Sequence, residues 1–116
     1  MANRASTRSM QTIRFVIDAD ASAAPFVYTL GQNVEICEIR TLTTAATGFV
    51  LTIRNGANSI TTVTSAGAIG DVDAAATLAP AYINIAAGGT LTVQTNAAGA
   101  RLIATIYVLP GCTATN

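Results

Sequence analysis

The sequence predicts one all-β domain, an antiparallel jelly roll or closely related β-sandwich of about eight strands. Three observations predict it. Short segments with alternating apolar residues recur along the chain, separated by turn signals rich in glycine, asparagine and aspartate. Valine, isoleucine and threonine are abundant, and β-branched side chains pack well on a pleated surface. The length of 116 residues fits a single domain.

Composition limits the classes of function. Only 10% of the residues are charged and the formal net charge is zero, so the chain has no basic field that would hold a nucleic-acid backbone. The sequence shows no stretch that approaches a transmembrane span and no uninterrupted apolar stretch typical of a signal peptide. We therefore expect neither nucleic acid nor a membrane as partner. A charge-poor surface instead favours coverage by other protein chains.

The start of the chain lacks hydrophobic periodicity. We expect a flexible N-terminal arm over residues 1–10, a jelly-roll domain over residues 11–111 and a C-terminal tail over residues 112–116. Alternation from Thr12 to Ile17, with Val16 as the exception, predicts the first half-buried strand. A second extended segment is expected over residues 26–30.

The next strand contains a break in its alternation. Val34 and Ile36 share one face, whereas Ile39 falls on the opposite parity. The apolar face stays inward only if one extra residue is inserted, so the pattern predicts a β-bulge near Cys37 and Glu38.

A hairpin is expected in the middle of the chain. The alternating segment Phe49 to Arg54 leads into Asn55-Gly56, and Ser59 to Thr64 returns antiparallel. Because asparagine and glycine both tolerate positive φ, the dipeptide predicts a type I′ turn.

Residues 66–79 interrupt the strand pattern. Asp71 or Asp73 is suited to cap a short helix from Ala74 to Leu78, and a loop with one helical turn fits the same residues. Alternation then resumes and predicts three more strands, over residues 82–85, 91–94 and 102–109.

The last predicted strand is apolar on both faces. Leu102, Ala104, Ile106 and Val108 form one face, and the other is mostly apolar too. Such a strand is either central and covered on both sides, or half in the core and half in a subunit interface. A two-layer sandwich has no second layer over its outer face, so we favour the interface. The predicted oligomer-interface residues are Ile103, Thr105, Tyr107 and Leu109.

Catalysis has little support. The chain has no histidine and no lysine, which removes the usual general base near neutral pH and Schiff-base chemistry. The six carboxylates match no recognised nucleophile motif, and only a two-carboxylate glycosidase mechanism stays open on paper. We predict that the protein is not an enzyme and has no cofactor.

No metal site is predicted either. Two pairs of aspartates lie two residues apart, but the spacing matches no known calcium loop, and turn or cap roles are favoured. Cys37 and Cys112 match no zinc pattern, and we favour two free thiols over one disulfide. The aspartate pairs are Asp18 with Asp20 and Asp71 with Asp73.

Three segments give the chain a resemblance to a known family. They are Gln11 to Asp18, Tyr82 to Val93 and Leu102 to Pro110. In strand layout and texture the chain resembles the small jelly-roll cement, or decoration, proteins of tailed-phage capsids, over nearly its whole length after the arm. The resemblance implies a homotrimer that is made in the host cytoplasm and sits on the capsid exterior.

In that family the trimers clamp neighbouring major capsid subunits at three-fold or quasi-three-fold positions. The resemblance therefore implies the major capsid protein as partner of this chain. Arg4 and Arg8 in the arm, with the outward Tyr82, are the expected partner contacts.

A recognition function is the alternative. Related jelly rolls occur at tail-fibre tips and in trimeric domains resembling tumour necrosis factor. Tyr28, Tyr82 and Tyr107 would in that case form a platform on which sugar rings stack, as in carbohydrate-binding modules.

Overall fold

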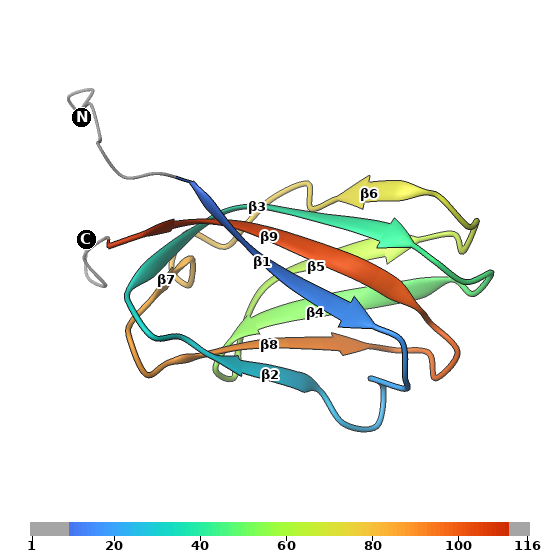
Figure 1. Cartoon of the computed structure of the whole chain (residues 1–116), viewed down its shortest axis with the longest axis horizontal. Coiled ribbons are helices and arrows are strands. Elements are labelled where there is room, and N and C mark those ends of the chain that lie inside the picture. The colour runs from blue at the N-terminus through green and yellow to red at the C-terminus, as the bar shows by residue number, and fades with distance from the viewer. Residues whose placement is uncertain (1–9, 112–116) are drawn as a thin grey trace.

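The computed structural model describes residues 10–111. Within them, nine antiparallel strands form two sheets that pack face to face, and there is no helix (Figure 1). The first sheet has the order β1 (Gln11–Ile17), β9 (Leu102–Pro110), β3 (Val34–Thr43) and β6 (Val72–Ala74), and β7 (Asn84–Ile85) also pairs with β3. The second sheet has the order β2 (Phe26–Thr29), β8 (Thr90–Thr95), β4 (Phe49–Asn55) and β5 (Asn58–Ser65).

The pairing order is that of a jelly roll. The first strand pairs with the last, β1 with β9, and the second pairs with the last but one, β2 with β8. The predicted fold class is therefore confirmed. The predicted arm, apart from Met10, and the predicted tail lie outside the described residues.

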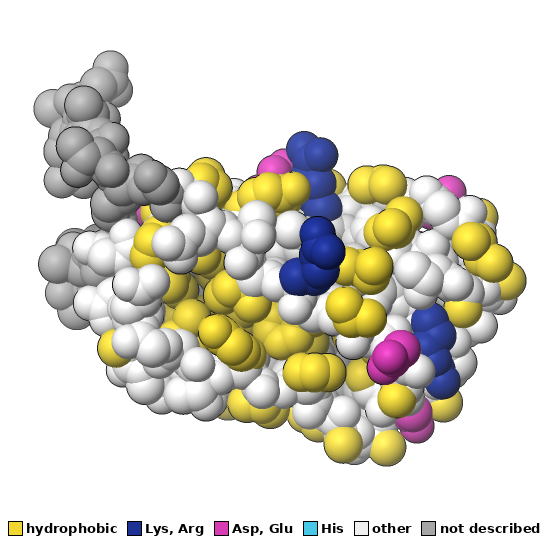
Figure 2. All heavy atoms as spheres, viewed as in Figure 1, with side chains coloured by type: hydrophobic (Ala, Val, Ile, Leu, Met, Phe, Trp, Pro, Cys, Tyr) yellow, Lys and Arg dark blue, Asp and Glu magenta, His cyan; other side chains and the backbone are white. Residues whose placement is uncertain are grey.

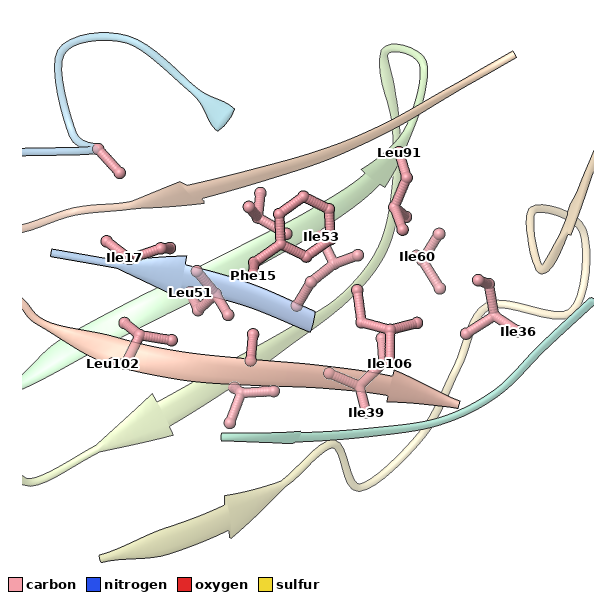
Figure 3. Close-up of a cluster of buried hydrophobic side chains, with 14 of the residues drawn as sticks. Phe15, Ile17, Ile36, Ile39, Leu51, Ile53, Ile60, Leu91, Leu102 and Ile106 are labelled. Carbon is pink, nitrogen blue, oxygen red and sulfur yellow. The ribbon is translucent and has the colours of Figure 1, made fainter. Parts of the chain in front are cut away.

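The core lies between the two sheets. Alternate residues of each long strand point inward, so β4 buries Leu51 and Ile53 while β9 buries Leu102 and Ile106 (Figure 3). The core consists of aliphatic side chains with two phenylalanines. This single core holds the two sheets together, and the side chains that point away from it form the outer face of each sheet.

The predicted bulge is confirmed in β3. Ile36 pairs with Val108 of β9, but the next pair is Glu38 with Tyr107, so Cys37 is the extra residue in the ladder. Because of this extra residue, Ile36 and Ile39 point to the same face of the sheet, and both are buried in the core.

The hairpin between β4 and β5 is confirmed, but its predicted turn type is wrong. Gly56 has a φ of 60°, and no other residue type in the described chain has positive φ, so Asn55 remains in the strand and the turn residues are Gly56 and Ala57. This is the pattern of a type II′ turn. Asn55 is held in the strand because its side-chain amide donates to the carbonyls of Tyr82 and Asn84, at 3.0 and 3.1 Å.

The predicted short helix from Ala74 to Leu78 is wrong. Val72 to Ala74 form β6 at the edge of the first sheet, and Ala75 donates its backbone N–H to the carbonyl of Ile39. These hydrogen bonds to β3 replace the ones that a helix would make. Residues 75–79 form a loop, without the helical turn of the alternative prediction.

Candidate interaction surfaces

One side of the sandwich is closed by the chain itself. The segment 75–83, which we call the bridging segment, runs between the two sheets. Ala79 donates its backbone N–H to the carbonyl of Ile60 in β5 at 2.9 Å, and Ile36 in β3 donates to the carbonyl of Ile83 at 2.8 Å. The bridging segment therefore covers the edge of β5 and ties it to the first sheet.

The opposite side is open. It ends in β1 and β2, each of which pairs with only one other strand. Here the sheets meet through side chains: the Phe15 ring of β1 lies edge-on to Phe26 and Tyr28 of β2, with ring centroids 5.5 and 6.2 Å apart. Phe15 is buried, whereas Phe26 and Tyr28 are close to half exposed. We call this surface the open side.

Two hollows flank these rings on the open side. One, of about 400 Å³, is lined by residues that include Ile13, Tyr28 and Val108, and the other, of about 310 Å³, by residues that include Val16 and Phe26. Figure 2 shows hydrophobic side chains gathered in a hollow between β1 and β2. The open side therefore combines two unpaired strand edges with exposed apolar side chains.

The outer face of the first sheet carries a continuous apolar row. Val16 of β1 lies opposite Ile103 of β9, Ile103 lies opposite Leu42 of β3, and Leu42 lies opposite Val72 of β6. Val16, Leu42 and Val72 are exposed, Val72 to 65%, and Ile103 is partly buried. This apolar row crosses β1, β9, β3 and β6, and no second layer formed by residues 10–111 lies over it.

The row beside it is mostly polar. It consists of Arg14, Thr105, Arg40 and Ala74, and Arg40 makes an ion pair with Glu38 at 3.0 Å between side chains that are each about half exposed. Arg14 makes no ion pair with any described residue. An exposed pair of this kind contributes about 1 kcal/mol or less, so it orients the two side chains more than it stabilises the sheet.

The four predicted interface residues all lie on the outer face of β9. They are partly buried, because β9 is a central strand between β1 and β3, whose side chains flank them. The residues are Ile103, Thr105, Tyr107 and Leu109. The outward orientation is as predicted, and Ile103 belongs to the apolar row. An interface there stays a prediction.

Sequence reasoning missed the most exposed members of the apolar row. Val16 gave a signal, because it broke the alternation of its strand. The sequence gives no such signal for Val72, because its neighbours Asp71 and Asp73 fit the cap of a short helix. Among the predicted partner contacts, Tyr82 is exposed in the bridging segment, while Arg4 and Arg8 lie outside the described residues.

The three tyrosines do not share one surface. Tyr28 lies opposite the buried Leu91, so its ring projects toward the space between the sheets, whereas Tyr107 points outward from the first sheet. Tyr82 belongs to the bridging segment. A single stacking platform built from all three tyrosines is therefore absent.

The described residues hold no cluster of three or more side chains of the types that ligate metals. Asp20 has a turn role instead: its carboxylate accepts hydrogen bonds from the Ser22 hydroxyl at 2.6 Å and the Ser22 N–H at 2.8 Å. These bonds lower the pKa of Asp20 because they favour the charged form. Asp73 lies within β6.

Over residues 10–111, no helix is long and apolar enough to span a membrane.

Comparisons with known proteins assign no family to the chain. It matched no protein-family model, no curated protein and no solved structure. The features on which a functional proposal can rest are therefore the chain's own surfaces.

Proposed function

We propose that this protein is a structural virion protein, a homotrimer that stabilises a tailed-phage head from the capsid exterior by clamping neighbouring major capsid subunits. The observation that carries the self-association is the apolar row from Val16 to Val72 on the outer face of the first sheet. The location on the capsid is proposed from the resemblance in strand layout to the decoration proteins of tailed phages.

The physical support for self-association is the cost of leaving this row in water. Full burial of a valine or leucine side chain contributes about 1.5–3 kcal/mol, so the exposed parts of Val16, Leu42 and Val72 together represent about 3 kcal/mol per copy. Few charged side chains are available to keep this surface hydrated, because only 10% of the residues are charged. Ile103 lies within this row, and Tyr107 lies further along β9 on the same outer face.

Attachment to the capsid is assigned to different residues. Arg4 and Arg8 of the arm and the exposed Tyr82 are the proposed contacts with the major capsid protein. Three copies in one trimer present three sets of these contacts, and their effective concentration raises the overall affinity without any strong single contact.

The oligomeric state tests the proposal directly. Sedimentation velocity of the purified chain is expected to show a trimer, and a monomer at micromolar concentration would contradict the proposal. Tyr107→Asp is expected to dissociate the trimer while the circular dichroism spectrum stays β-rich, because an unpaired charge is costly to bury. Ala57→Asp, in the exposed β4–β5 turn, adds the same charge away from this face and is the matched control.

Attachment is tested by co-sedimentation with expanded phage capsids. The full chain is expected to pellet with them, and deletion of residues 1–10 is expected to leave the trimer intact while weakening attachment. If the deletion variant binds as tightly as the full chain, the arm has no such role.

The alternative, a fibre-tip or carbohydrate-binding jelly roll, has one supporting feature. Tyr28 lines the larger open-side hollow together with the polar residues Gln11, Thr12 and Gln32, a combination suited to a sugar ring. A glycan array separates the two functions: hits that Tyr28→Ala abolishes would favour recognition, and an array without hits removes it.

A further inference from the structure

A polar groove lies over β4 and β8 on the outer face of the second sheet, on the opposite side of the sandwich from the apolar row. The two strands are neighbours in this sheet (Figure 1). Ile53 of β4 and Val93 of β8 are buried in the core, so the side chains that alternate with them point outward. The groove has a volume of about 630 Å³. We call it the Arg54 groove, and its lining residues are Ser22, Val50, Thr52, Arg54, Gln94, Thr95 and Asn96.

Arg54 supplies the charge of this groove. It is partly buried and makes no ion pair with any described residue, and none of the described residues that line the groove is acidic. The carboxylate of Asp20 is bound to Ser22, but Asp20 lines the smaller open-side hollow instead, and Arg101 acts on its charge. Within residues 10–111, the Arg54 groove therefore presents a cation without a counter-ion.

Hydrogen bonds within the chain use both amide oxygens of the groove and leave donors. Oε1 of Gln94 accepts from Nη1 of Arg54 at 3.0 Å, and Nε2 of Gln94 donates to the carbonyl of Ser22 at 2.9 Å. Oδ1 of Asn96 accepts from the backbone N–H of Val50 at 2.8 Å. The other N–H groups of Arg54 and the amide nitrogen of Asn96 make no hydrogen bond to a described residue. The groove is therefore suited to a ligand rich in acceptors.

The same hydrogen bonds fix the spacing of the donors. Gln94, which holds the Arg54 guanidinium, lies opposite Thr52 of β4. Asn96 is bound at Val50, two residues away along β4, and two residues of a strand span about 7 Å. The cation and the amide donor are thus separated by a distance comparable with the width of one sugar ring.

We propose that the Arg54 groove binds a sugar that carries a carboxylate, a uronic or a sialic acid. Because Arg54 uses Nη1 for Gln94, its Nε and Nη2 remain to donate to the two carboxylate oxygens, the two-bond geometry that arginine makes with this group. The amide nitrogen of Asn96 donates to an oxygen at the far side of the ring, and the Thr52 hydroxyl exchanges hydrogen bonds with the sugar hydroxyls.

A sugar suits the groove better than an acidic peptide. Apart from Arg54, the lining side chains are amides and hydroxyls, and Val50 is the single apolar residue among those described. Such groups match the hydroxyls of a sugar, whereas the apolar side chains of a peptide would find little surface to bury. The site is independent of the proposed self-association, because the apolar row lies on the other sheet.

Glycan binding by the full chain tests the proposal. On an array, oligomers of galacturonic acid and sialyllactose represent the two sources of the carboxylate, and at least one of them is expected to bind. Methyl-esterified galacturonate oligomers keep the sugar without the charge and are expected to bind about tenfold more weakly or less, by NMR titration. An array without carboxylated hits overturns the proposal, and so does equal binding of the methyl ester.

Two variants with a matched control locate the site. Arg54→Gln is expected to weaken binding by about tenfold or more, whereas Arg14→Gln, which removes the same charge from the outer face of the first sheet, is expected to leave it unchanged. Asn96→Asp keeps the oxygen that accepts from Val50 but replaces the donor by a second oxygen, so it is expected to weaken binding too. Unchanged binding in Arg54→Gln overturns the proposal.

Further measurements separate this site from the other candidates. Binding that Tyr28→Ala abolishes and Arg54→Gln keeps would place the sugar in the open-side hollow and contradict the Arg54 groove. Polyglutamate that binds as tightly as the carboxylated glycans would show a protein ligand in place of a sugar. Sedimentation velocity of Arg54→Gln is expected to match that of the unmodified chain, so a failure of the trimer and a failure of sugar binding are observed separately.

Discussion

Thr41 and Asp73 lie opposite each other across β3 and β6, and each buries a side-chain oxygen that has no hydrogen-bond partner among the described residues. Two residues further along β3, Thr43 is buried to the same degree, with 1% exposure for each threonine, but its hydroxyl lies 2.8 Å from that of Ser65. One strand thus contains a satisfied and an unsatisfied buried threonine.

The same substitution at these two positions should have opposite effects. Valine has nearly the shape of threonine without the hydroxyl, so Thr41→Val is expected to raise the free energy of unfolding by up to about 1 kcal/mol. Thr43→Val is expected to lower it by about 1–2 kcal/mol, because the hydrogen bond to Ser65 is lost. Urea denaturation of both variants checks this. Equal losses would show that the Thr41 hydroxyl does have a partner.

Gly67 and Gly70 form a second matched pair. Both have a φ of 92°, but a Cβ on Gly67 would lie 2.4 Å from the backbone nitrogen of Gly48, whereas a Cβ on Gly70 meets nothing within 4 Å. Gly70→Ala is expected to cost about 1–2 kcal/mol from backbone strain alone. Gly67→Ala is expected to cost about 4 kcal/mol or more, because backbone atoms of the 47–48 segment must move. Thermal denaturation of both variants measures the difference, and similar melting temperatures would contradict it.

The turn around Asp20 predicts a change in acid titration. Its pKa lies below the ordinary 3.8, first because of the Ser22 hydroxyl, so the folded state favours the carboxylate. The stabilising effect is therefore present above pH 3.8 and disappears as the pH falls through the lowered pKa. Ser22→Ala is expected to raise the pKa of Asp20 in an NMR titration, while Ser22→Thr keeps it low. An unchanged pKa in Ser22→Ala would assign the effect to the backbone N–H.

Local patterns predicted most of the fold. The bulge at Cys37 was predictable because the parity change between Ile36 and Ile39 is visible in the sequence. The turn type was not, because Asn55 is held by the carbonyls of Tyr82 and Asn84, which lie far along the chain. The same limit applies to β6, whose residues pair with β3 although a capped helix suits them locally.

The candidate surface was predictable only in part. The alternation in β9 correctly predicts that Ile103 and Tyr107 face away from the core. Exposure, however, depends on which strands lie at the sheet edges, and the order that places β1 and β6 there is a property of the whole fold. This is why the exposed Val72 had no signal in the sequence.

The rings of the open side lead to a last prediction about how the two sheets are held together there. Phe15 is 3% exposed and Phe26 is 48% exposed, although their rings are in contact. Phe15→Ala is expected to cost about 3–5 kcal/mol, because it leaves a cavity in the core. Phe26→Ala is expected to cost about 1–2 kcal/mol, from the aromatic contact and the buried half of the ring.

The urea midpoints of these two variants are to be compared under conditions in which the unmodified protein is fully dissociated, so that subunit contacts do not contribute. Phe26→Leu keeps an apolar side chain without the ring and isolates the edge-to-face contact, worth about 0.5–1.5 kcal/mol. A loss in Phe26→Ala as large as that in Phe15→Ala would contradict the open side as described. The Phe26 ring would then be an essential cover of the core within one copy.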